Sequence, residues 1–177
     1  MAGLGHLAIG FAVKPLAPKV PLGVMLAATE VNDILWAVFN ITGIDKSAAM
    51  TGASPLSHGL FMSVVWSVAA ALLAAFICRN HRHGVIIGLL VFSHWLVDLL
   101  THPMGAIFGG KPLPPDLPLF LSGSPQVGFG LYNGSFAVAM AIDMGMLILG
   151  VIIYATSIVK KRREDKNRGI TQAKNSF

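Results

Sequence analysis

The stretch SHWLVDLLTH, residues 93–102, places three ionisable side chains at four-residue intervals within an apolar run. His94, Asp98 and His102 would share one face of a helix, because residues four apart are neighbours on a helical surface. Neutral imidazole and carboxylate groups are the ligand types that suit zinc and related divalent metals. We therefore interpret this face as one wall of a metal-binding cluster.

The composition of the whole chain is that of an integral membrane protein. Of its 177 residues, 54% are hydrophobic and 12% are charged, and the mean hydropathy is +0.69. Soluble domains carry about 25% charged residues, and a spanning helix needs about 20 apolar residues. The sequence predicts an all-α membrane bundle of about five transmembrane segments over residues 1–159, followed by a basic cytoplasmic tail at 160–177. The predicted spans are residues 3–17, 20–41, 59–78, 84–101 and 131–159, of which the first is short for a full crossing.

The positions of Lys and Arg predict how these segments are oriented. Cytoplasmic loops are enriched in basic residues, so the more basic set of span ends should face the cytoplasm. The N-terminus is then outside, and the connections at 42–58 and 102–130 face outward, the second as a Gly/Pro-rich cap. The more basic set holds Lys14, Lys19, Arg79, Arg82 and the block 160–163, whereas the opposite set holds Lys46 and Lys111.

The same charge distribution argues against nucleic acid as a partner. The net charge is +5, but most basic residues follow the last apolar run, where they would contact anionic membrane lipids. We therefore expect lipids as partners, and the sequence leaves the oligomeric state open. Cys78 is the single cysteine, which rules out an intramolecular disulfide and a thiolate metal site.

On this topology, each of the five segments brings a histidine or a carboxylate to the outer half of the membrane or near its centre. A charged side chain at mid-membrane costs roughly 2.5–3.5 kcal/mol. Such groups must therefore neutralise one another, face water or bind a cation, and the joint pattern favours a cation more than any single position does. The residues concerned are His6, Glu30, Asp33, His58, His94, Asp98, His102 and Asp143.

Each position also has a structural interpretation. A lone histidine such as His94 is commonly hydrogen-bonded for structure, and Asp98 fits a helix–helix hydrogen bond. Glu30 and Asp33 fit a proton relay of the kind found in transporters. His102 fits a ligand, a helix cap or a residue at the rim. It is open whether Asp143, in the fifth segment, joins the cluster or only anchors its helix.

Four patches of the chain resemble, in order, the LexA-regulated, inner-membrane-associated metal-dependent hydrolases of bacteria and archaea. GHLAIG is similar to the family's opening Gly-His, and ATEVND to an acidic motif that usually reads Pro-Asp-x-Asp. PLSHGLF is similar to a segment that often reads His-Arg-Gly-x-Thr-His-Ser. SHWLVDLLTHP is similar to the Ser-His-x-x-x-Asp-x-x-Thr block and is the closest match. Together the patches span about residues 3–105.

The resemblance implies a divalent metal, with zinc expected, in an integral protein of a prokaryotic inner membrane. Two departures stand out: Glu30 and Asn32 occupy positions where the family usually has two Asp, and the His-Arg-Gly is missing before Ser57. The metal ligands that the resemblance implies are His6, Glu30, His58, His94 and Asp98.

The expected activity is that of a membrane hydrolase, phospholipase-like or phosphatase-like. Zinc lowers the pKa of its bound water from about 15.7 to about 7, and this water would attack an ester or phosphoester of a lipid-like substrate at the outer side. Glu30 and Asp33 are the candidate catalytic residues, each as a ligand or as the base that takes a proton from the water. Two alternatives come from other classes: an ion or proton transporter built on the intramembrane carboxylates, and a non-catalytic membrane scaffold.

Overall fold

The computed structural model describes residues 4–45, 54–104, 113–121 and 123–174, so Lys46 and Lys111 lie outside the described residues. The described chain is mostly helical, as predicted, with one pair of two-residue strands. The elements in chain order are α1 (Leu4–Val13), the 3₁₀ turn η1 (Lys14–Leu16), α2 (Leu22–Thr29), α3 (Val31–Thr42), α5 (Pro55–His58), α6 (Leu60–Cys78), α7 (His81–Thr101), β1 (Leu117–Pro118), β2 (Gln126–Val127) and α8 (Phe136–Lys174).

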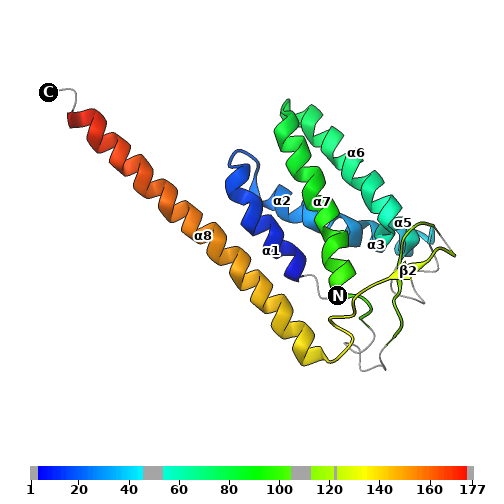
Figure 1. Cartoon of the computed structure of the whole chain (residues 1–177). Helices are drawn as coiled ribbons and strands as arrows, with labels where there is room; N and C mark the ends of the chain where they lie inside the picture. The colour runs from blue at the N-terminus through cyan, green and yellow to red at the C-terminus, as the bar shows by residue number, and fades with distance from the viewer. Residues whose placement is uncertain (1–3, 46–53, 105–112, 122, 175–177) are drawn as a thin grey trace.

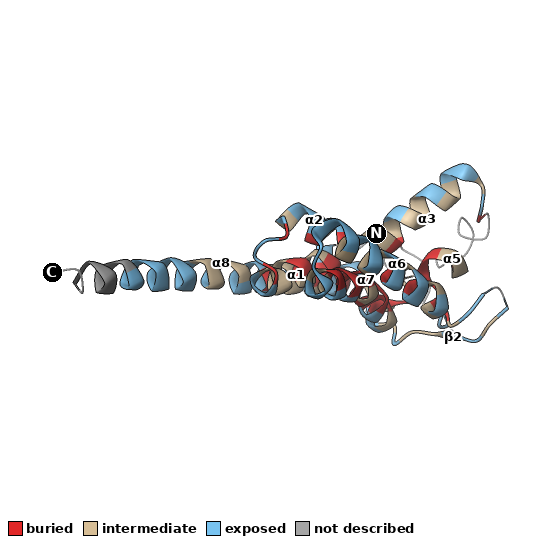
Figure 2. Cartoon of the chain, turned by 90° about the horizontal axis from the view of Figure 1, so that it is seen from above, coloured by how far each residue is buried: buried red, intermediate tan, exposed pale blue. Residues whose placement is uncertain are grey.

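Helix α7 is the centre of the bundle. It packs against α6 along its length and also contacts α1, α2 and α3, while α1 lies between α7 and α8 (Figure 1). Helix α8 contacts α1 and then continues as an isolated rod beyond the other helices (Figure 2). The apolar core forms where α7 meets α2, and includes Met25, Leu90 and Val91.

Three helices are long and apolar enough to cross a membrane by length and composition: α6, α7 and the Phe136–Arg168 part of α8. Helices α2 and α3 together pass the same test but are bent by 60° at Glu30, so they form either a broken span or a re-entrant loop. The first predicted span is a shorter apolar helix, Leu4–Leu16. The described residues therefore contain three candidate spans, or four with the bent pair, and five spans are not confirmed.

The exposure of side chains is compatible with a membrane around the bundle. Large apolar residues of α6 such as Leu72 and Phe76 are 67% and 82% exposed, whereas α7 buries most of its length. In water such a surface would be unfavourable, but lipid tails solvate it.

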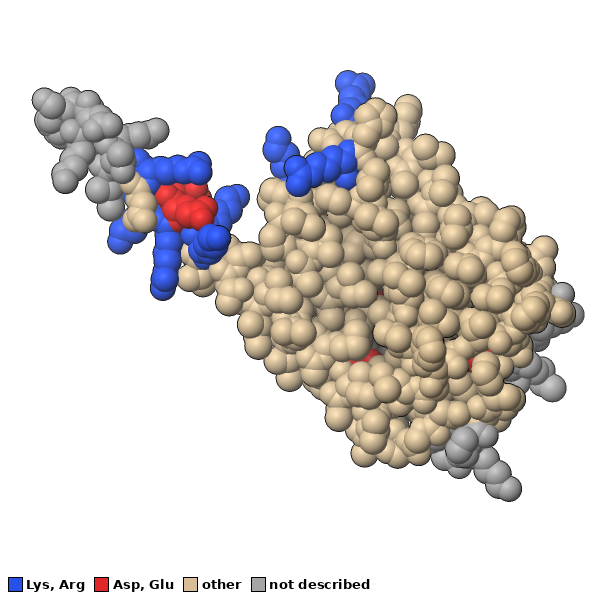
Figure 3. Space-filling model, in the orientation of Figure 1, with Lys and Arg blue, Asp and Glu red and all other residues tan. Residues whose placement is uncertain are grey.

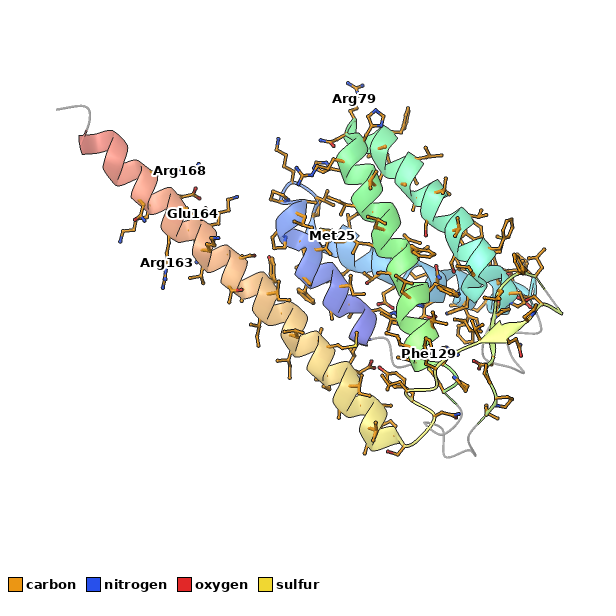
Figure 4. The ribbon with its side chains drawn as sticks, in the orientation of Figure 1. Met25, Arg79, Phe129, Arg163, Glu164 and Arg168 are labelled. Atoms are coloured by element: carbon orange, nitrogen blue, oxygen red, sulfur yellow. The ribbon has the colours of Figure 1, made fainter. Side chains whose placement is uncertain are left out.

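The described Lys and Arg residues lie at element ends that meet at one end of the bundle or on the α8 extension (Figure 3). Arg79 marks this basic end of α6 and α7, and Phe129 lies at the opposite end, beside the C-terminus of α7 (Figure 4). Because Lys46 and Lys111, the basic residues of the opposite set, lie outside the described residues, the orientation stays a prediction.

Small residues allow α6 and α7 to pack closely. A Cβ added to Gly88 would lie 2.8 Å from both the Ala71 Cβ and the Ser67 carbonyl oxygen, and one added to Gly84 would lie 2.5 Å from the Ala71 carbonyl oxygen. Close backbone approach of this kind is a main source of helix association in lipid, where no hydrophobic force holds helices together.

We expect Gly88→Leu to destabilise the protein by about 1–3 kcal/mol, because the added side chain must force two packed backbones apart. Unfolding in mixed micelles, followed by Trp fluorescence, measures this change. Gly145→Leu is the matched control, since a Cβ at this α8 position would meet nothing within 4 Å. Equal stability of the two variants would contradict the packing explanation.

Candidate metal centre

Helix α7 supplies the middle of the candidate site. His94 and Asp98 lie one turn apart near its C-terminal end, with Nε2 of His94 3.3 Å from Oδ2 of Asp98. Their side chains are 1% and 2% exposed. The face predicted from the four-residue spacing is therefore turned into the bundle and away from lipid.

The break between α2 and α3 orients the His94 ring. Nδ1 of His94 donates a hydrogen bond to the carbonyl of Thr29, the last residue of α2, at 2.7 Å. Backbone groups freed inside a membrane need such partners. Because a carbonyl only accepts, the proton of neutral His94 is on Nδ1, and the lone pair of Nε2 faces Asp98.

Two more imidazoles come from α1 and α5. Nε2 of His6 is 3.4 Å from Oδ1 of Asp98, and the His6 ring stacks on His94 with centroids 3.8 Å apart. Nε2 of His58 is 3.7 Å from Oδ2 of Asp98, and the His58 and His94 rings meet edge to face at 5.4 Å. Segments far apart in the sequence thus surround one buried carboxylate with imidazole nitrogens.

His102 follows α7 directly and is held by the Pro-rich loop that contains Asp116. Its Nδ1 donates to Asp116 at 2.9 Å, while Nε2 is 3.9 Å from Oδ1 of Asp98. Burial by itself lowers the pKa of His102, but the hydrogen bond to Asp116 and the charge of Asp98 outweigh it and raise this pKa above its ordinary value. The backbone N–H groups of Phe129, Leu131 and Tyr132 donate to the last carbonyls of α7, and that of Gly130 donates to the His102 carbonyl, so this segment also fixes where the helix ends.

Asp33 and Glu30 take different positions at the edge of the cluster. Oδ1 of Asp33 is 3.1 Å from Nε2 of His58 and 3.6 Å from Nε2 of His94, and the Asp33 side chain is 42% exposed. The Glu30 carboxyl lies close enough to His6, His94 and Asp33 to interact with them electrostatically, but it joins neither group of possible ligands found in the described residues. Asp33 therefore combines a position suited to a metal ligand with a side chain that is partly exposed at the surface of the bundle.

The distances among these atoms fit a tetrahedral divalent metal. Ligand atoms about 2.0–2.2 Å from a zinc ion lie about 3.3–3.6 Å from one another in a tetrahedron. The measured separations between nitrogen and carboxylate oxygen run from 3.1 to 3.7 Å for His6, His58 and His94. Two groups of donors within 4.8 Å of one another result: His6, His94 and Asp98, and Asp33, His58 and His94.

Two buried atoms at the centre of the cluster lack a hydrogen-bond partner among the described residues. Within the described part of the chain, neither Nε2 of His94 nor Oδ2 of Asp98 has a hydrogen-bond partner, although they face each other at 3.3 Å. Both atoms carry lone pairs when His94 is neutral, and an unsatisfied buried polar atom costs about 1–3 kcal/mol. A shared cation would satisfy both atoms.

Asp143 belongs to a neighbouring contact. Its Oδ1 accepts a hydrogen bond from the hydroxyl of Tyr132, a fully buried residue in the segment that leads into α8. Asp143 also packs against α1, where a Cβ added to Gly5 would lie 2.8 Å from this oxygen. The carboxylate thus joins α8 to the segment before it and to α1, and it is not part of either group of candidate ligands found in the described residues.

The residues that hold the imidazoles in place were not predicted from the sequence. Thr29 orients the His94 ring through its backbone carbonyl, and the pattern of side chains in the sequence does not predict a contact with a backbone group. Asp116 lies in a Pro-rich loop of irregular structure, and the sequence gives no spacing from which its contact with His102 could be predicted. Ser57, whose Oγ is 2.8 Å from Nδ1 of His58, directly precedes that histidine and is the one partner that the sequence could have suggested.

No protein-family model, no curated protein and no solved structure matches the chain.

Proposed function

We propose that the chain is a metal-dependent hydrolase embedded in a membrane, with zinc held by the imidazoles and carboxylates around Asp98. The observation that carries this proposal is the set of nitrogen–oxygen separations of 3.1–3.7 Å around a buried carboxylate oxygen and an imidazole nitrogen that lack hydrogen-bond partners. The order of the four sequence patches that resemble the inner-membrane hydrolase family supports the same assignment.

The groups behind the imidazoles favour a metal over a purely structural cluster. His94 and His102 each direct Nε2 toward Asp98 while Nδ1 donates to a carbonyl or a carboxylate. Metal-binding histidines almost always donate their other nitrogen in this way, which fixes the tautomer and the ring orientation. A mixed nitrogen and oxygen donor set suits zinc.

Glu30 and Asp33 have different roles in this proposal. A bound zinc ion supplies the acidity that makes water a nucleophile near neutral pH. Asp33, which has ligand geometry, helps to hold the ion at the more exposed side of the cluster. Glu30, which lies beside the cluster without joining it, accepts the proton of the attacking water and returns it to the leaving alcohol.

The surroundings of the site favour a lipid-like ester or phosphoester. The cluster lies in the half of α7 that is opposite the basic end of the bundle (Figure 4), and this position favours the outer leaflet by the positive-inside rule. The cap exposes apolar side chains, with Phe120 57% and Phe129 77% exposed. An apolar rim beside a polar centre suits a substrate whose tails stay in lipid.

We expect Glu30→Gln to lower the rate of hydrolysis by about 100-fold, because removal of a general base costs about this factor or more. The zinc content should stay unchanged, since the residue is assigned as a base and not as a ligand. Initial rates and elemental analysis on the same sample separate the two effects. Loss of zinc together with activity would reassign Glu30 as a ligand.

The proposed function is tested by incubating purified protein with vesicles of mixed phospholipids and identifying the products by mass spectrometry. Hydrolysis should require zinc, stop after chelation and return when zinc is added. Stoichiometric zinc without any lipid product would favour a structural metal in a scaffold. Proton or ion flux in protein-containing vesicles, with no hydrolysis, would favour a transporter.

A further inference from the structure

We infer that the cluster around Asp98 holds two divalent cations, with the two oxygens of its carboxylate facing one cation each. The inference rests on the proposed function, because it concerns the same cluster. Its first support is that the two oxygens face different imidazoles. Oδ2 is 3.3 Å from Nε2 of His94 and 3.7 Å from Nε2 of His58, whereas Oδ1 is 3.4 Å from Nε2 of His6 and 3.9 Å from Nε2 of His102.

The first cation site is formed by His58, His94 and Asp33, with Oδ2 of Asp98 completing four donors. Nε2 of both histidines lies near Oδ1 of Asp33, at 3.1 and 3.6 Å. This group contains the partly exposed carboxylate of Asp33, so it is the site that water and substrate can reach. Four donors satisfy a tetrahedral ion, and expansion to five leaves room for water.

The second cation site is formed by His6, His102 and Oδ1 of Asp98. A single cation in the first site would leave Oδ1 of Asp98 and the imidazoles of His6 and His102 without a cation. His94 is within reach of both groups, but the single lone pair of its Nε2 can bind only one ion. His102 is already oriented for the second site, because Asp116 accepts the hydrogen from its Nδ1.

The charges around the cluster support two ions as well. Four carboxylates contact or interact with its imidazoles, and two divalent cations would balance their charge. Uncompensated buried charge is strongly unfavourable. These carboxylates belong to Glu30, Asp33, Asp98 and Asp116.

The inference is tested by the zinc content of purified protein and by titration of the chelated protein with zinc in a calorimeter. We expect two zinc ions per chain and two binding events. His102→Gln should lower the content to one ion while keeping the first site, and His58→Gln should also lower it to one. His81→Gln, at the exposed start of α7, is the matched control and should keep two.

The outcomes separate this inference from the proposed function. One zinc ion per chain in active wild-type protein would overturn the two-ion site and leave the hydrolase proposal intact. Absence of any bound zinc would overturn both. Two ions in His102→Gln would overturn the assignment of the second site. Because a variant can fail to fold, wild-type protein loaded with manganese gives an independent reading: spin-coupled ions support the shared carboxylate, and isolated ions contradict it.

Discussion

Replacing Asp98 with asparagine is expected to remove bound zinc and hydrolytic activity together. Asparagine keeps the size of the side chain but loses the charge that imidazoles from three parts of the chain surround. Changes to residues that only support a ligand cost 10–100-fold in metal affinity or activity, so loss of the central ligand should weaken zinc binding by more than about 100-fold. Elemental analysis after gel filtration and competition with a coloured chelator measure this affinity.

Asp143→Asn is the matched control for this experiment. It makes the same substitution at a carboxylate that is equally buried but lies beside Tyr132 and joins neither group of candidate ligands. We expect it to keep wild-type zinc content even where it lowers stability. Wild-type zinc affinity in the Asp98 variant, or equal loss in both variants, would contradict a centre built around Asp98.

Removal of zinc from the wild-type protein is expected to abolish hydrolysis and to lower the free energy of unfolding. A ligand that binds only the folded state stabilises it by about 4 kcal/mol when its free concentration is 1,000 times its dissociation constant. The chelated cluster also leaves buried atoms of His94 and Asp98 without partners. Thermal unfolding in detergent, with and without chelator, measures the change.

An Asp98→Asn variant provides the control for this experiment, since it removes the carboxylate charge that faces every imidazole of the cluster. Its unfolding temperature should not respond to the chelator. Identical unfolding curves for wild-type protein with and without chelator would show that the cluster does not depend on a cation.

The proximity of His94 and Asp98 was predictable because the candidate ligands repeat along one helix. His94 and Asp98 are separated by four residues in an apolar run, and helical geometry alone puts them on one face. Their depth in an apolar chain then implied further partners, and the structure brings His6, His58 and His102 to the same carboxylate. The energetic cost of charged side chains within apolar segments, more than the spacing of residues in the sequence, made the proximity of these side chains predictable.

The paths of the first helices were not predictable in the same way. The apolar run over residues 20–41 has the length of one span, but the structure breaks it at Glu30 and turns it by 60°. The freed Thr29 carbonyl is satisfied by His94, which comes from a helix far along the chain. A hydropathy pattern does not contain such a tertiary hydrogen bond, so the separate roles of Glu30 and Asp33 could not be assigned from sequence.

Anomalous X-ray diffraction at the zinc absorption edge tests the central claim most directly. We predict anomalous peaks within about 2.0–2.2 Å of Nε2 of His94 and a carboxylate oxygen of Asp98. Data collected just below the edge should lack these peaks, which identifies the element. Density for an ordered protein with no anomalous peak among His58, His94 and Asp98 would contradict the metal centre and, with it, the proposed hydrolase.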